Sequence, residues 1–203
     1  MNFRTATRHT DSKPGSAARA RIVMSANELF YAEGFRAVSV DRIVGASNVT
    51  RVTFYRHFPS KDHLIKTYLE SRLATERAAL AELRAASEND PRATLASLVA
   101  TIVAELASPG FRGCPYQNFA AEFADSDHPA RGVVSEHGGW LFAELEALLG
   151  ESKHPRSTEA AGELVLLRAG AMALASTDFS EKVADVLNVR WSTIVTAGTD
   201  ARR

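Results

Sequence analysis

The sequence predicts an all-α protein with a small N-terminal three-helix bundle and a larger helical body. From Ala17 onward, apolar residues recur every three or four positions, which is the spacing of one helix face. Capping residues, glycines and prolines divide the 203-residue chain into about nine such segments, and no segment shows a convincing strand pattern. We expect three parts: an arm over 1–16, a bundle over 17–60 and a body over 61–203.

Composition limits the class of protein. Hydrophobic residues make up 45% of the chain and charged residues 24%, as in globular proteins that bury a core. No apolar run approaches the roughly 18 residues of a membrane span, and the N-terminus lacks the apolar region of a signal peptide. The single cysteine, Cys114, excludes an intramolecular disulfide. We therefore expect a cytoplasmic protein without a membrane partner.

Charge is distributed unevenly although the net charge is zero. Residues 1–66 carry 11 Lys and Arg against 5 Asp and Glu, whereas residues 67–203 carry 13 against 19. A basic front end favours contact with a polyanion, and a chance fluctuation is the alternative. The polar arm over 1–16, with Arg4, Arg8 and Lys13, is expected to be flexible. It either reaches phosphates or a minor groove or is only a solvated tail.

The first helix of the bundle is expected from Ala17 to Gly34. Its apolar stripe consists of Ile22, Ala26, Leu29 and Phe30. Gly34 is placed to close the helix in a left-handed conformation.

Two short helices are predicted next, separated by a tight turn. Ser39 can cap the first of them, and Thr50 can cap the second, which Pro59 ends. Between the two lies Asn48, a residue type that tolerates positive φ. This order is typical of a helix-turn-helix motif.

The last of the three helices is expected to present a polar face. Phe54 and Phe58 are four residues apart and face inward, which turns the other side chains outward or to the flanks. The outward and flanking residues are Arg51, Val52, Thr53, Tyr55, Arg56 and His57. Arginine can donate twice to guanine, and hydroxyls can bind phosphates, so this face predicts a helix that enters the major groove of double-stranded DNA. Lys61 offers a further phosphate contact.

Residues 19–71 resemble the DNA-binding domain of the TetR-type transcriptional repressors. The resemblance rests on Asn48-Val49-Thr50, on Thr53-Phe54-Tyr55-Arg56-His57-Phe58 and on Pro59-Ser60-Lys61, whereas Asn48 and Val44 replace the usual glycine and alanine. It implies DNA contacts by Thr53, Tyr55, His57 and Lys61, base reading by Arg51 and a phosphate near Ser39. Thr50 and Arg56 complete the predicted DNA-binding set.

A long helix over 61–86 is expected to join the bundle to the body. At 1.5 Å per residue it is about 40 Å long, enough to connect two parts mechanically. Further helices are predicted over about 92–107, 116–124, 130–149, 158–176 and 180–197.

The resemblance implies that the body binds a small-molecule effector. Aromatic residues gather between 111 and 142, with a few polar residues among them. The candidate pocket residues are Phe111, Tyr116, Asn118, Phe119, Glu122, Phe123, His137 and Trp140. Ordinary core packing of the same residues is the alternative.

No cofactor, metal or catalytic group is expected. The possible metal ligands lack the histidine spacing of a metalloprotease helix, and 125–129 has turn chemistry. These are Glu122, Asp125, Asp127, His128 and His137. Cys114 lies in no catalytic signature, so a redox-sensing or buried thiol is favoured.

The last two helices are expected to form a homodimer interface, because small and apolar residues alternate along them. The candidate interface residues are Leu164, Leu167, Gly170, Leu174, Leu187, Trp191 and Ile194, with burial inside one protomer as the alternative.

The combined prediction is a homodimeric repressor that binds a pseudo-palindromic operator and is released by a small molecule. One alternative is a constitutive regulator, which a filled body would favour. The other is an all-α enzyme, which a turnover screen would reveal.

Overall fold

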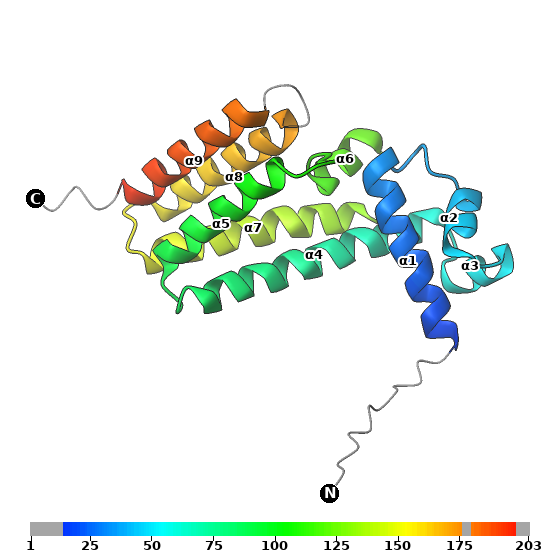
Figure 1. Ribbon diagram of the computed structural model, residues 1–203. Coiled ribbons are helices and arrows are strands. Elements are labelled where there is room, and N and C mark those ends of the chain that lie inside the picture. The colour runs from blue at the N-terminus through cyan, green and yellow to red at the C-terminus, as the bar shows by residue number, and fades with distance from the viewer. Residues whose placement is uncertain (1–13, 176–179, 198–203) are drawn as a thin grey trace, which may run out of the picture.

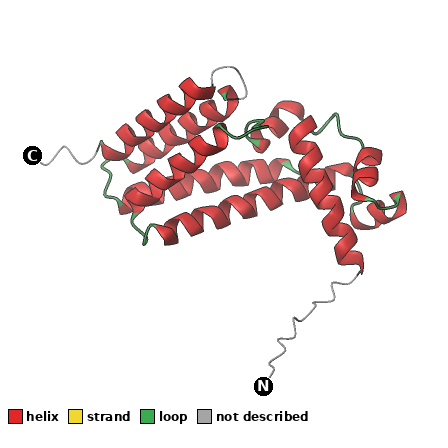
Figure 2. Ribbon diagram, in the orientation of Figure 1, coloured by secondary structure: helices red, strands yellow, loops and turns green. Residues whose placement is uncertain are grey.

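The protein consists of helices joined by loops. A computed structural model describes residues 14–175 and 180–197, and every regular element within these ranges is helical (Figure 2). In chain order these are α1 Pro14–Glu33, α2 Val40–Ser47, α3 Arg51–His57, α4 Lys61–Ala86, α5 Pro91–Leu106, α6 Pro115–Glu122, α7 Arg131–Glu151, α8 Ser157–Leu174 and α9 Ser180–Thr196. The predicted all-α class is confirmed, and so is the order of its helices within the described ranges. None of these helices combines the length and apolar content needed to cross a bilayer.

The first helix begins earlier than the sequence predicts. It starts at Pro14 rather than at Ala17, so residues 14–16 are helical and do not belong to the expected arm. Proline suits a first helical turn, because a backbone N–H there would have no helical partner. The rest of the predicted arm, residues 1–13, lies outside the described residues.

The ends of α1, α2 and α3 follow from the local signals. Ser39 and Thr50 have extended backbones, and each hydroxyl oxygen accepts from the backbone N–H three residues later, at 3.2 and 3.1 Å. Gly34 has φ 90° and Asn48 has φ 49°, both in the left-handed region. The predicted helix-turn-helix is therefore present.

α4 packs against both the α1–α3 bundle and the body, and its buried residues join them in one hydrophobic core. Figure 1 shows it leaving the α1–α3 bundle and running along the body beside α5 and α7. Near its start, the Tyr68 ring lies edge-on to Phe30 and Phe35, with centroids 5.9 and 5.7 Å away. Farther along, Leu73 and Leu80 are buried in the body. Burial raises the pKa of Tyr68 to about 12, so the phenol stays neutral near pH 7.

The body is a packed set of long helices, with α8 and α9 side by side as its outer layer (Figure 1). Trp191 of α9 is almost fully buried, and its Nε1 donates to the Leu95 carbonyl of α5 at 3.1 Å. The short helix α6 lies between the body and the α1–α3 bundle (Figure 1).

Candidate nucleic-acid interface

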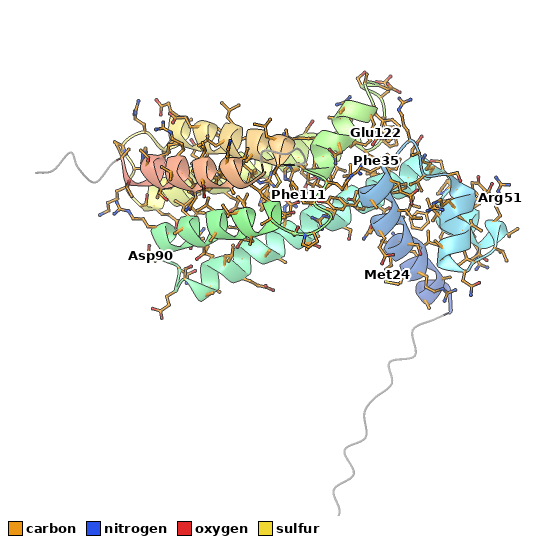
Figure 3. The ribbon with its side chains drawn as sticks, turned by 45° about the horizontal axis from the view of Figure 1, so that its top comes forward. Met24, Phe35, Arg51, Asp90, Phe111 and Glu122 are labelled. Carbon is orange, nitrogen blue, oxygen red and sulfur yellow. The ribbon has the colours of Figure 1, made fainter. Side chains whose placement is uncertain are left out.

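Helix α3 exposes a mixed basic and apolar surface. Phe54 and Phe58 are buried and anchor the helix, as predicted. On the opposite side Val52 is 79% exposed and Tyr55 is 46% exposed. Arg51, at the outer edge of the bundle in Figure 3, and Arg56 are exposed as well. The exposed side of α3 therefore offers two guanidinium groups, a phenol and one small apolar side chain to solvent.

The first turn of α3 is tied to the first turn of α2. Arg51 Nε lies 3.4 Å from Asp41 Oδ1, and both side chains are mostly exposed. The hydroxyls of Thr50 and Thr53 are 2.9 Å apart beside the same turn, so one donates a hydrogen bond to the other. Asp41 is not among the DNA-binding residues that the sequence predicts.

His57 and Lys61 lie at the other end of α3 and are half-buried. The Nε2 atom of His57 is buried without a hydrogen-bond partner among the described residues. Burial lowers the pKa of Lys61, and nearby Arg36 lowers it further, while Asp62 and Glu122 oppose the shift. A phosphate at this end of α3 would favour the charged amine.

The predicted pocket residues do not form one pocket. Tyr116 and His137 meet as stacked rings with centroids 3.7 Å apart. Phe119 and Phe123 instead pack against the ring of Phe35, from the loop between α1 and α2. Phe111, Asn118 and Glu122 line a different hollow, which lies beside the end of α1. Trp140 is half-buried, with the guanidinium of Arg77 5.7 Å from its ring centroid.

Glu122 fastens α6 to the α1–α2 loop. Its carboxylate accepts from the backbone N–H groups of Phe35 at 3.0 Å and Arg36 at 2.6 Å. Arg36 Nε donates back to the Glu122 carbonyl at 2.7 Å, and its guanidinium lies 5.0 Å from the centre of the Phe123 ring. Figure 3 shows Glu122 and Phe35 together where the body meets the bundle. We call these contacts the Glu122 clasp.

A cavity of about 210 Å³ lies among α6, α7 and α8. Its lining is mostly apolar, with polar groups from Gln117, His137 and Arg168. Of the predicted pocket residues, Tyr116 and His137 line it. The other lining residues are Cys114, Ala120, Val134, Gly138, Leu141, Val165 and Ala169.

A partly buried ionic group lies beside one wall of this cavity. His137 Nε2 lies 3.1 Å from Glu76 Oε2, and Arg168 Nη2 lies 3.7 Å from the same oxygen. Burial alone would raise the pKa of Glu76, but the hydrogen bond from His137 and the charges of Arg168 and Arg72 outweigh it and lower the pKa. Sequence reasoning missed Glu76, although its position between Leu73 and Leu80 on the inward stripe of α4 was a usable signal.

The outer faces of α8 and α9 form an apolar groove of about 600 Å³. Leu167, Gly170, Leu174, Leu187 and Ile194 from the predicted interface set line it. Leu164 and Trp191 do not line it, and both are buried in the core of the protomer. Leu166 and Val186 line it and are 73% and 58% exposed.

No group of three or more His, Cys, Asp or Glu side chains within 14–175 and 180–197 is placed to hold a metal ion. Cys114 is a buried free thiol.

Known protein families and curated proteins are similar to this chain mainly in its N-terminal part. The family of bacterial regulatory proteins called the tetR family has a model that matches residues 22–68. The HTH-type transcriptional regulator TcmR of Streptomyces glaucescens is 36% identical over 89 residues, which are 41% of this chain and 39% of TcmR. The transposon Tn10 TetC protein of Escherichia coli is 40% identical over 52 residues, 26% of each chain. The matches thus span less than half the length of these curated relatives.

Solved structures extend the similarity to the whole chain. A TetR-family regulator from Cytophaga hutchinsonii shares the fold, with a TM-score of 0.81 at 17% identity, covering 96% of this chain and 100% of its own. SCO4454, a TetR-family transcriptional regulator from Streptomyces coelicolor, is 34% identical with a TM-score of 0.86. That match covers 91% of this chain and 97% of SCO4454. With a helix-turn-helix bundle, a helical body and a match to this relative that covers nearly all of both chains, the chain belongs to the TetR family of transcriptional regulators.

Proposed function

We propose that the protein is a homodimeric repressor that binds a pseudo-palindromic operator and is released by a small molecule. The observation that carries this proposal is the exposed face of α3, where Arg51, Val52 and Tyr55 project from a helix anchored by buried Phe54 and Phe58. A short helix held this way fits a DNA major groove. Occupying an operator blocks transcription from an overlapping promoter, which is the simplest regulatory output.

The DNA contacts divide into base readers and phosphate binders. Arg51 stands at the N-terminal end of α3, the end that reaches base edges in helix-turn-helix proteins. Hydroxyl groups surround that end of α3, from Ser39, Thr50 and Thr53. Further donors to the phosphates of the DNA backbone come from Tyr55, Arg56, His57 and Lys61.

A second copy of the chain is the proposed occupant of the α8–α9 groove. One helix-turn-helix reads too few base pairs for useful specificity, and two related by a twofold axis read half-sites about 34 Å apart. The groove is apolar and carries Glu163 together with Lys182 and Arg190, so a twofold partner can bring opposite charges together at its rim.

Release by an effector is proposed to work through α6. The start of this helix lines the cavity with Tyr116 and Gln117, and its last residue, Glu122, holds the α1–α2 loop. A ligand that shifts α6 therefore acts on the orientation of the bundle. A 100-fold loss of operator affinity requires about 2.7 kcal/mol of coupling between the two sites.

The size of the cavity leaves room for constitutive regulation as a second candidate function. Its volume of about 210 Å³ is below the roughly 300–1,000 Å³ of common ligand pockets. Either a small ligand fits as the cavity stands or the body has no effector and the protein regulates constitutively.

DNA recognition is tested by selecting binders from a pool of random duplexes of about 30 base pairs. We expect a motif with twofold symmetry and half-sites about one helical turn apart. A pool that shows no enrichment after repeated rounds rejects operator binding.

Effector release is tested by filling the cavity. Small, largely apolar molecules that raise the melting temperature are titrated into the protein–operator complex. Gly138 lines the cavity and a Cβ there meets no atom within 4 Å, so Gly138→Leu should abolish release without loss of folding. Gly139 has the same open surroundings but does not line the cavity, so Gly139→Leu is the matched control. Equal release in both variants would place the effector elsewhere, and no release by any stabilising molecule would favour constitutive regulation.

A further inference from the structure

One surface ion pair connects the two helices of the helix-turn-helix. Arg51 Nε lies 3.4 Å from Asp41 Oδ1, and the side chains are 63% and 68% exposed. Arg42, which follows Asp41, pairs with Glu33 of α1 at 2.7 Å and does not compete for that carboxylate. Asp41 therefore has one cationic partner among the described residues, and this partner is the proposed base reader.

Stability does not explain this pair. Exposed ion pairs contribute little to folding, because water screens them and two flexible side chains lose freedom. A carboxylate on a DNA-facing surface also repels phosphates, so it reduces affinity for every duplex. Asp41 lies in the first turn of α2, where it also interacts with the helix dipole. The interaction with the helix dipole requires an acid in the first turn of α2, but it does not require that the acid contact a side chain of α3.

The geometry of the guanidinium gives the carboxylate a second role. The ion pair involves Nε at 3.4 Å, and neither terminal nitrogen of Arg51 has a hydrogen-bond partner among residues 14–175 and 180–197. Because a guanidinium is planar and rigid, a carboxylate beside Nε leaves the two terminal nitrogens, which lie side by side, available to a second partner. This is the fork that donates to O6 and N7 of guanine.

We infer that Asp41 is a specificity-determining residue that positions Arg51 for a guanine in each operator half-site. Asp41 fixes the long side chain of Arg51 before DNA arrives, so less conformational freedom is lost on binding the correct base. The inference rests on the proposed operator binding and adds a residue to it. Asp41 touches no base itself and acts through Arg51.

The test compares specificity with affinity in the full-length dimer. The operator obtained by selection is mutated at each position, and the position at which Arg51→Ala loses its preference identifies the guanine. Asp41→Asn keeps the size of the side chain while removing its charge, and with it the interaction with the dipole of α2. We expect Asp41→Asn to reduce the preference for guanine at that position at least threefold and to leave the preferences elsewhere unchanged.

Overall affinity separates positioning from a structural role. Asp41→Asn removes a negative charge, so its affinity for unrelated duplexes is expected to stay level or rise. The double variant Asp41→Asn with Arg51→Ala should match Arg51→Ala alone in its preference at that base pair. Glu33→Gln removes the neighbouring ion pair with Arg42 and is the matched control, with all preferences expected to remain.

Two results would overturn the inference. If Asp41→Asn weakens binding to all duplexes equally and lowers the melting temperature, the carboxylate serves only α2. If its guanine preference equals that of the unaltered protein, the ion pair does not position Arg51. Failure of the proposed function is distinct, because then the unaltered protein selects no operator and Arg51→Ala identifies no base pair.

Discussion

The proposed DNA contacts around α3 fall into two kinds, those to the DNA backbone and those to base edges. Lys61 is half-buried at the start of α4, next to the end of α3, so its amine is placed for a phosphate rather than for a base edge. We expect Lys61→Gln to weaken binding to all duplexes by a similar factor and to reduce the slope of log K against log salt by about 1.

Measurements of operator affinity at several salt concentrations check this expectation. Lys66→Gln is the control, because Lys66 lies on the same helix and pairs with Glu70 at 3.7 Å. An unchanged salt slope in Lys61→Gln, or an equal change in Lys66→Gln, would contradict a phosphate contact at Lys61.

Val52 is expected to make an apolar contact with DNA. The side chain is 79% exposed next to Arg51, where an isopropyl group can contact the methyl group of thymine. Val52→Ala should cost about 1 kcal/mol at one thymine, in line with the loss of a small apolar contact. Alanine favours helices, so α3 itself is expected to stay intact.

The measurement uses the DNA as well as the protein. Replacing the thymine by deoxyuridine removes only its methyl group, so it should weaken the unaltered protein and leave Val52→Ala unaffected. If both proteins respond equally to deoxyuridine at every position, Val52 reads no methyl group.

How far residues were predictable depends on the range of their contacts. The capping roles of Ser39 and Thr50 and the positive φ of Asn48 depend on neighbours within a few residues, so the sequence predicts them correctly. The Glu122 clasp joins residues 87 positions apart, and no local pattern indicates it. Glu122 lines a hollow beside the end of α1 as well, so the sequence predicts a pocket residue but not its bonds to the α1–α2 loop.

At the scale of elements, α4 carries the partly buried carboxylate of Glu76 on the face where an amphipathic helix usually carries an apolar residue. Glu76 is 22% exposed and faces His137 of α7 and Arg168 of α8. The pKa of Glu76 is lower in the folded protein than in the unfolded chain. The ionised carboxylate therefore stabilises the fold at pH values above the unfolded-state pKa, and this stabilisation is lost as the pH falls through the folded-state pKa. Glu76→Gln should therefore destabilise the protein by about 1–3 kcal/mol at pH 7, with the difference shrinking below pH 4.

Denaturant unfolding at pH 7 and at pH 3.5 tests this pH dependence. Glu70→Gln is the control on the same helix, since Glu70 is 51% exposed and should change stability by less than about 0.5 kcal/mol. A Glu76→Gln penalty of the same size at both pH values would mean that packing, not charge, is responsible.

The elements were more predictable than the cavity between them. Each helix has its own periodicity and caps, which explains the correct order of helices. The residues from 111 to 123 cluster in the sequence but diverge in space, because successive side chains of α6 point to different neighbours. Tyr116 reaches His137, whereas Phe119 reaches Phe35. Which aromatic residues share a cavity thus depends on packing, and sequence density alone does not decide it.

At the scale of the whole molecule, the apolar surface of α8 and α9 would stay exposed to water in a monomer. Leu166 lies in the groove and is 73% exposed, so an aspartate there meets water in a monomer but an apolar partner in a dimer. Leu166→Asp should leave the folded protomer intact and shift the mass in solution from twice 22.0 kDa to 22.0 kDa. Burying one unpaired charge on each side of a twofold interface costs several kcal/mol in total, enough to separate protomers at micromolar concentration.

Operator affinity should fall together with the dimer, because two bundles held at a fixed spacing bind two half-sites far more tightly than one bundle binds one. Sedimentation and operator binding measured on the same samples test this link. Ala147→Asp adds the same charge at an exposed position of α7 outside the groove and should change neither property. If Leu166→Asp remains a dimer, the protomers meet through another surface. If it becomes a monomer but keeps full affinity, each bundle recognises its site alone, and the twofold operator is wrong.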